Sequence, residues 1–174
     1  MVVFNPPGVS SLGNETLLWV PAIVNLAAMT VAEGTATGAV NVSFAVRGFG
    51  PGGDQGTSTD VRLGTRVAYE NPGRFSPTID DITYVYDPQA TTGAAVNKHY
   101  ETLIENAVGF LVDIRGLDAT NFTLTAAQKY VAYPVQLGAQ RPVAIDPTSE
   151  GGKFEIVQKP YVISPGPTKG TVAA

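Results

Sequence analysis

The sequence predicts a mainly β protein: a β-sandwich or incomplete barrel flanked by a single α-helix, with extended N- and C-terminal arms. Three observations predict this fold class. Apolar and polar residues alternate in several separate runs, which is the pattern of strands with one buried face. Only one run has a helical period, and both ends of the chain are rich in proline and glycine with little apolar periodicity. The length of 174 residues suits one ordinary domain.

The chain divides by composition into three parts. Pro6, Pro7 and Gly8 stand near the start, and the end of the chain has a similar character. We therefore expect an N-terminal arm over residues 1–15, a β domain over residues 16–164 and a C-terminal tail over residues 165–174.

Five alternating runs predict strands in chain order, and a sixth predicts a bent strand. The first five runs are residues 40–46, 61–69, 82–86, 108–114 and 131–137. The sixth, residues 154–163, changes its apolar face part-way, which predicts a bulge or bend near Gln158. Pro134 and Pro160 predict that their strands lie at sheet edges, because proline cannot donate a hydrogen bond to a ladder.

The predicted helix covers residues 95–107 and is expected to pack on a sheet face. Its apolar stripe consists of Val96, Tyr100, Leu103, Ile104 and Ala107, and Lys98, Glu101 and Glu105 lie on the opposite side. Residues 25–33 are compatible with a short helical turn or with part of a strand.

The charge content favours a subunit of a larger assembly. Only 15% of the residues are charged, against about 25% in typical globular proteins, so a lone soluble subunit has little charge with which to cover its surface. The alternative is that Thr, Ser, Asn and Gln solvate the surface instead. A net charge of -4 argues against a protein that wraps nucleic acid, because such binding needs Lys and Arg to neutralise phosphates.

Several kinds of site are excluded by composition. There is no cysteine and only one histidine, His99, so thiolate ligands, disulfides and multi-histidine metal sites are ruled out. The longest apolar stretch, residues 17–32, is too short to span a bilayer and contains Pro21 and Asn25. No Lys or Arg precedes it as in a signal peptide. We expect no membrane anchor.

A glycine-rich segment at residues 48–53 formally matches the GxGxxG dinucleotide fingerprint. A dinucleotide-binding loop must open directly into a helix whose amides hold the pyrophosphate. Here more polar loop residues follow and then another alternating run. The segment therefore predicts a long hairpin loop, of a length that is usually functional or disordered, and no cofactor is expected.

No group of residues forms a convincing catalytic centre. Asp80 and Asp81 are neighbours, and on a strand they would point to opposite faces, so we interpret them as the end of a turn. His99 has no nucleophile in its sequence context and is expected to face solvent or an interface. Arg47, Arg62 and Arg66 could form a basic patch.

The alternative for these arginines is ion pairing with Asp54, Asp60 or Glu70, and this alternative is favoured. We expect a protein without catalytic, cofactor or metal residues.

The order of features resembles the major tail proteins, or tail tube proteins, of long-tailed bacteriophages, especially those that infect actinobacteria. The local motifs of the resemblance are Trp19-Val20-Pro21 and Thr30-Val31-Ala32-Glu33. It also rests on the layout of a proline-rich arm, a strand pair with a long loop, a single helix and further strands. The likeness covers nearly the whole chain in layout.

This resemblance implies a structural virion protein, made in the host cytoplasm, whose copies assemble into hexameric rings stacked as a tube. DNA would pass through the lumen without specific binding, past an acidic wall that repels phosphates. Its partners would be further copies of the chain, with the tape measure and tail terminator proteins as further candidates.

The resemblance also implies where rings touch, because in the family a long loop between early strands reaches the next ring. The candidates here are Gly48, Phe49, Gly50, Pro51, Gly52, Gly53, Asp54, Gln55, Gly56, Thr57, Ser58 and Thr59. The second candidate is the N-terminal arm, with Val3, Phe4, Asn5, Pro6 and Pro7. Both would order on assembly.

Two alternatives stay open at this point. One is another virion part, such as a capsid decoration or head-tail joining protein. The other is a stand-alone β-sandwich that binds carbohydrate, which would need exposed aromatic residues on one face. Trp19, Tyr84, Tyr86 and Tyr133 are the candidates, although the alternation assigns them largely to the core.

Overall fold

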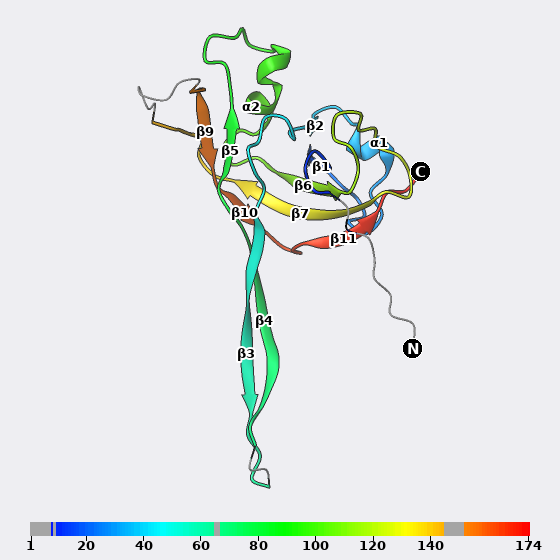
Figure 1. The fold of residues 1–174 in the computed structure, drawn as a ribbon, viewed down its shortest axis with the longest axis vertical. Helices are drawn as coiled ribbons and strands as arrows, with labels where there is room; N and C mark the ends of the chain where they lie inside the picture. Colours follow the sequence, from blue (N-terminus) through cyan, green and yellow to red (C-terminus); the bar gives the residue numbers. More distant parts are fainter. Residues whose placement is uncertain (1–7, 9, 65–66, 145–151) are drawn as a thin grey trace.

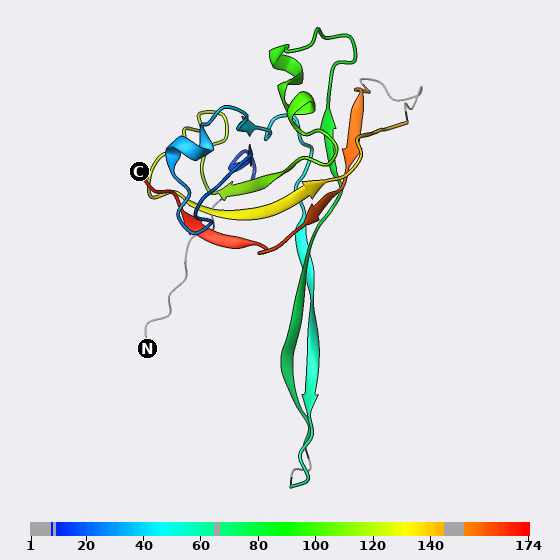
Figure 2. The ribbon, with the colours of Figure 1, turned by 180° about the vertical axis from the view of Figure 1, so that it is seen from behind.

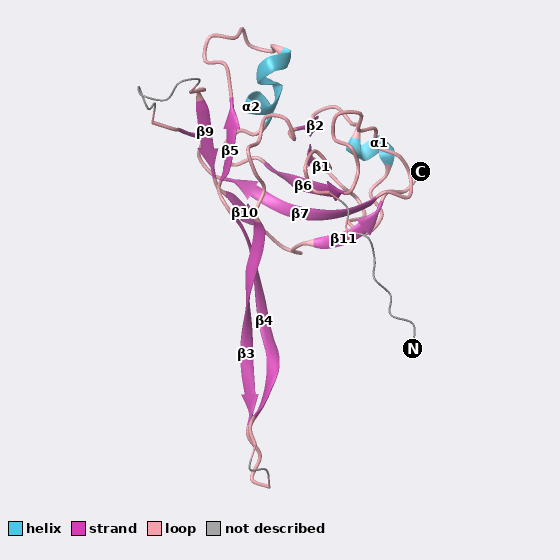
Figure 3. Cartoon of the chain, in the orientation of Figure 1, coloured by secondary structure: helices cyan, strands magenta, loops and turns pink. Residues whose placement is uncertain are grey.

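The computed structural model describes residues 8, 10–64, 67–144 and 152–174 (Figure 1). Strands dominate, as predicted, and the helical segments are short (Figure 3). The strands are β1 (Glu15–Val20), β2 (Val40–Asn41), β3 (Pro51–Asp60), β4 (Tyr69–Ile79), β5 (Ile82–Val85), β6 (Val108–Arg115), β7 (Lys129–Leu137), β8 (Arg141–Pro142), β9 (Glu155–Gln158), β10 (Pro160–Val162) and β11 (Thr168–Thr171). The helices are α1 (Val31–Gly34), the 3₁₀ turn η1 (Ala95–Asn97) and α2 (Lys98–Thr102).

The main sheet is antiparallel, with the order β10-β7-β6-β1-β2. The last strand, β11, pairs with the first half of β7, and β10 pairs with its final residues. A second sheet has the order β5-β9-β8, and β3 pairs with β4 as a separate two-stranded hairpin. Only short breaks separate β4 from β5 and β9 from β10, so both chain segments run from one sheet into another.

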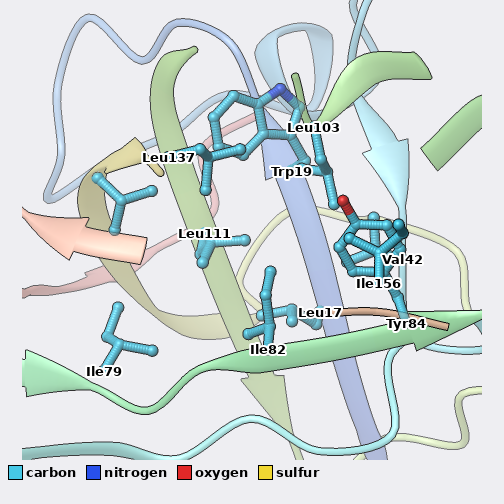
Figure 4. Packing of buried hydrophobic residues seen from close by; sticks show 11 residues of the cluster. Leu17, Trp19, Val42, Ile79, Ile82, Tyr84, Leu103, Leu111, Leu137 and Ile156 are labelled. Carbon is cyan, nitrogen blue, oxygen red and sulfur yellow. The ribbon is translucent and has the colours of Figure 1, made fainter. Parts of the chain in front are cut away.

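The larger core lies between the main sheet and the β5-β9-β8 sheet (Figure 4). Alternate residues of β1 and β6, including Trp19 and Leu111, face Ile82, Tyr84 and Ile156 from the second sheet. Trp19 is tightly enclosed, because a Cβ added at Gly109 would lie 2.6 Å from its ring. Gly109 is thus required by the close approach of the indole rather than by backbone conformation.

A second core lies on the other face of the main sheet. Leu18, Val112 and Ala132 point into it from the central strands, and Met29 and Val172 close it from outside. The strands β1, β6 and β7 are therefore buried on both faces.

The segment 40–46, predicted as a strand, pairs as β2 only over Val40–Asn41. The Ser43 hydroxyl donates to the Asn41 carboxamide at 2.6 Å and accepts from the Leu17 amide at 2.8 Å. Such local hydrogen bonds compete with a strand ladder, and the chain turns at Val42. It then meets the second sheet, where the Val85 amide donates to the Ala45 carbonyl at 3.1 Å.

The positions of the early strand and loop are also corrected. The predicted loop, residues 48–59, is strand β3 from Pro51 onward, and the predicted strand 61–69 is largely the turn region between β3 and β4. The predicted strands 82–86, 108–114 and 131–137 are confirmed by β5, β6 and β7.

The predicted helix 95–107 is shorter than expected. It consists of η1 and α2 and ends at Thr102. Side-chain amides occupy the carbonyls at its end: Gln140 and Gln158 both donate to the Leu103 carbonyl, at 3.2 and 2.9 Å. The buried side chains are Asn97, His99 and Leu103, whereas Val96 and Ile104 of the predicted stripe are exposed.

The expected bend near Gln158 is confirmed, because β9 and β10 belong to different sheets. Pro160 lies in an edge strand, as predicted, but the prediction for Pro134 is wrong. Its strand β7 is paired on both sides, and Pro134 lies between the residues paired with β10 and those paired with β11. At this gap the Pro134 carbonyl accepts a hydrogen bond from the Ile163 amide at 2.9 Å. Neither β10 nor β11 needs the amide hydrogen that proline lacks.

The C-terminal segment is extended but is not a free tail, because β11 is part of the main sheet and Val172 is 2% exposed. Of the expected N-terminal arm, residues 1–7 and 9 lie outside the described residues.

Gln158 joins the two sheets and the helix end through polar contacts. It is fully buried, accepts from the Tyr84 hydroxyl at 3.0 Å and donates to the Leu103 and Gly138 carbonyls at 2.9 and 2.8 Å. We expect Gln158→Leu to lower the free energy of unfolding by about 1–3 kcal/mol, because it leaves buried polar groups without partners. Chemical denaturation measures this change.

The matched control is Gln136→Leu on the exposed side of β7, which should change stability by less than about 0.5 kcal/mol. Equal effects of the two substitutions would contradict the structural role of Gln158.

Candidate assembly surface

The most prominent feature of the surface is the hairpin of β3 and β4, which projects away from the body (Figure 1). The view from behind shows the same projection, with no other element beside its outer part (Figure 2). The ten residues of β3 run along β4 from the pair Pro51↔Ile79 at the base to the pair Asp60↔Tyr69 near the tip. At about 3.3 Å per residue, this ladder is about 33 Å long.

Neither face of this hairpin is covered by the subunit. Nearly every residue of both strands is exposed, and Ile79 at the base is the one that is buried. Tyr69 and Phe75 are 60% and 50% exposed. A two-stranded hairpin on its own is at best marginally stable in water, so the surface is suited to contact with another molecule.

A bulge interrupts the ladder half-way along. Between the pairs Gln55↔Phe75 and Thr57↔Pro72, Gly56 stands opposite two residues, Gly73 and Arg74. The Gln55 side-chain amide donates to the Gly73 carbonyl. A Cβ at Gly73 would lie 2.9 Å from the Gly56 carbonyl oxygen, so the two strands approach here in a way that needs glycine.

The candidate inter-ring residues fall into two groups. Residues 48–50 lie in the body, where the Phe49 ring packs edge-on against Tyr133 at a centroid distance of 5.4 Å. Residues 51–59 belong to the hairpin. The candidate arm residues Val3, Phe4, Asn5, Pro6 and Pro7 lie outside the described residues.

Two of the arginines near the hairpin form ion pairs. Arg62 pairs with Asp60 at 2.9 Å, and Arg47 pairs with Glu155 at the edge of the body. Ion pairing of these two arginines is therefore confirmed, with Glu155 a partner that the sequence did not suggest; Arg66 lies outside the described residues. Asp80 and Asp81, expected at the end of a turn, lie in the short break between β4 and β5, where Asp81 forms an ion pair with Arg141 at 2.9 Å.

The expectation for His99 is wrong. His99 is 9% exposed, its Nε2 lies 2.6 Å from the Val85 carbonyl oxygen and its ring packs edge-on against Tyr84. Burial arises because the helix is short and turns this face toward β5. The aromatic residues proposed for carbohydrate binding are also mostly enclosed, with Trp19 3% and Tyr84 0% exposed.

A buried carboxyl that the sequence did not suggest lies beside a hollow of about 680 Å³ lined by residues of β6, β7 and β11. Asp113 is 3% exposed and its Oδ2 lies 2.8 Å from Arg115 Nε, while its Oδ1 has no hydrogen-bond partner. Burial raises the pKa of Asp113 to about 6, and Arg115 only partly offsets this effect. Lys129 and Lys169 line the same hollow.

The other chemical features are few. Within the described ranges, no group of three or more acidic or histidine side chains is placed to hold a metal ion. None of the helices in the described part of the chain is long and apolar enough to cross a membrane.

The comparison with protein families decides the assignment. A family model described as "Phage tail tube protein" matches residues 4–174. The chain belongs to the phage tail tube protein family. The comparison with curated proteins returned no match. The tail tube protein is thus a structural component of the virion, and the family implies self-assembly into the tube of the tail.

The two motifs of the resemblance have structural roles in this tail tube protein. Trp19 fills the larger core. Thr30 is the N-cap of α1, where its hydroxyl accepts from the Glu33 amide at 3.2 Å and the Glu33 carboxylate accepts from the Thr30 amide at 2.7 Å. These hydrogen bonds form a capping box and lower the pKa of Glu33.

The raised pKa of Asp113 predicts a pH-dependent stability. A carboxyl that ionises less readily when folded contributes stability below about pH 4, and this contribution is lost as the pH rises through about 6. Relative to the wild type, the free energy of unfolding of Asp113→Asn should increase by on the order of 1–3 kcal/mol as the pH rises between these values. Urea denaturation at a series of pH values measures the difference.

Asp118→Asn is the control with the opposite sign, because hydrogen bonds from Thr120 and Asn121 lower the pKa of Asp118. The free energy of unfolding that Asp118→Asn loses relative to the wild type should become smaller as the pH falls. Parallel stability curves for the wild type and Asp113→Asn would contradict a raised pKa of Asp113.

Proposed function

We propose that six copies of this tail tube protein form a ring, that rings stack into the tail tube, and that the β3–β4 hairpin makes the contact between rings. The observation that carries the proposal is a hairpin of one ten-residue and one eleven-residue strand that leaves the body with neither face covered. Membership of the tail tube family supplies the setting in which further copies surround each subunit.

Unpaired sheet edges support contacts between copies. On the described part of the chain, β2 and β8 end their sheets, and each strand of the hairpin has one open edge. Exposed edges invite pairing with other chains. Neighbouring copies in a ring would cover such edges and close the wall of the tube.

The hairpin has features that keep its edges from uncontrolled pairing before assembly. Pro72 and Pro77 lie in β4 and cannot donate to an added strand, and Asp54 and Arg74 place charge beside the ladder. Several glycines in β3 leave room for the backbone of a neighbour. The hairpin therefore fits a contact that forms in one defined geometry.

The remaining roles follow from the same proposal. The phage genome would pass through the lumen without specific binding, and the net charge of -4 favours weak attraction for phosphates. The N-terminal arm, including residues 3–7, is the second candidate for contacts between rings. Further partners would be the tape measure protein inside the tube and the terminator protein at its end.

Removing the projecting hairpin tests its role. In the variant, an Asn-Gly turn replaces residues 53–77 and joins Gly52 to its partner Thr78, since this dipeptide favours two-residue hairpins. We expect a folded subunit that forms no tubes, because the deleted residues do not belong to either core. Circular dichroism checks the fold, and electron microscopy with light scattering checks assembly.

The control is Val24→Glu, a substitution at a 95% exposed position outside the hairpin. This control should polymerise like the wild type. Tubes of normal length from the shortened variant would overturn the assignment of the hairpin, and a wild type that stays a single subunit at all concentrations would overturn the proposed function as a whole.

A further inference from the structure

An apolar groove lies at the end of the body where β5 stops and β9 begins. It encloses about 370 Å³. The apolar lining residues are Val85, Tyr86, Pro88, Val96 and Phe154, and the polar ones are Asp87, Gln89 and Lys153. Val96 and Phe154 are 58% and 50% exposed, so the groove is an open apolar surface of the kind that marks an interaction site.

Polar contacts behind the groove hold its walls in place. The Asn97 side chain, which is 5% exposed, accepts from the Asp87 amide at 2.9 Å and donates to the Asp87 carbonyl at 2.6 Å. His99 contacts the Val85 carbonyl oxygen at 2.6 Å. These contacts tie the segment after β5 to the helix, so the groove is formed before any partner arrives.

Aromatic packing fixes the remaining side of the groove. The Tyr86 ring stacks on Tyr100 at a centroid distance of 5.0 Å and meets Phe154 edge-on at 6.4 Å. The floor of the groove is therefore part of the body of the subunit, whereas Val96 and Phe154 present apolar surface outward.

The hairpin tip presents a second apolar surface. Val61, Leu63 and Val67 are 72%, 112% and 60% exposed. These are alternate residues of the run that the sequence analysis predicted as a strand with one buried face, yet no such face is buried within the described subunit. An apolar pattern of this kind at the end of a projecting hairpin indicates burial against another molecule.

Groove and tip lie at opposite ends of the long axis of the molecule. The chain runs from the tip along β4 and continues directly into β5, whose far end lines the groove (Figures 1 and 2). A copy displaced along this axis brings its tip toward the groove of the next copy. Such a head-to-tail contact between different surfaces repeats without closing, as a stacked assembly requires.

We propose that the groove receives the hairpin tip of a second copy, with Leu63 as the central apolar contact against Val96 and Phe154. This inference rests on the proposed stacking of rings and names the acceptor surface for the hairpin. Charge is compatible with the contact, because Lys153 on the groove is opposite in sign to Glu70 beside the tip.

Two single substitutions test the two halves of the contact. Leu63→Glu places a charge on the tip and Val96→Glu places one in the groove, and both side chains are exposed in the subunit, so the fold should be unchanged. We expect each variant alone to raise the concentration needed for tube formation by about ten- to hundredfold, the loss expected for one buried apolar side chain. Val24→Glu, at a 95% exposed position away from both surfaces, is the control that should polymerise normally.

A mixture of the two variants distinguishes this contact from a general loss of solubility. Leu63→Glu keeps an intact groove and Val96→Glu keeps an intact tip, so an equal mixture should form one junction and stop, doubling the mass of the starting unit in light scattering. A mixture that stays at the mass of the separate variants would overturn the proposal.

Cysteine cross-linking gives a direct test, because the chain has no cysteine of its own. The double variant Leu63→Cys with Val96→Cys should form a ladder of disulfide-linked copies under oxidation once tubes assemble. The control double variant, Leu63→Cys with Val24→Cys, should form no such ladder. A wild type that assembles while the first double variant gives no ladder would overturn the groove assignment alone, and would point to another occupant, such as a different virion protein. A wild type that never assembles would instead overturn the proposed function.

Discussion

Burial of β1, β6 and β7 on both faces is the constraint on which the rest of the tail tube subunit depends. For example, β1 carries Leu17 and Trp19 toward one core and Leu18 and Val20 toward the other. The second sheet, the helices and the C-terminal strand each cover part of this central ladder. The β3–β4 hairpin contributes to neither core beyond Ile79 at its base, so the subunit combines a body stabilised by its own packing with an extension that is not.

This division explains which parts of the fold the sequence predicts. Alternation identifies β5, β6 and β7 because each is packed against an apolar layer, and the bend at Gln158 is visible because the apolar face changes there. Apolar-polar alternation does not identify β3, because neither face of this strand is buried and residues such as Gly52 and Asp54 do not alternate with apolar ones. It also fails after Asn41, where side-chain hydrogen bonds with Ser43 end the strand.

The candidate assembly residues show the same limit. A segment of unusual composition is evident from the sequence, but whether it is a loop or a paired strand depends on β4, which lies many residues later. The apolar residues of the tip are visible as a pattern, and only the structure shows that the subunit does not bury them. The burial of Asp113 cannot be predicted from the sequence. It depends on the pairing of β6 with β1 and β7, which places Asp113 between Leu17 and Val131.

The bulge at Gly56 has a consequence for the mechanics of a filament. Opposite it stand Gly73 and Arg74, so neither glycine adds a side chain to the packing at that point, and bulges bend and twist the strands that contain them. A rod joined through such arms would yield at the midpoint of each arm, by small rotations about backbone bonds, before the junctions at its two ends come apart. Curvature of the whole filament would then be distributed over many soft joints of equal stiffness.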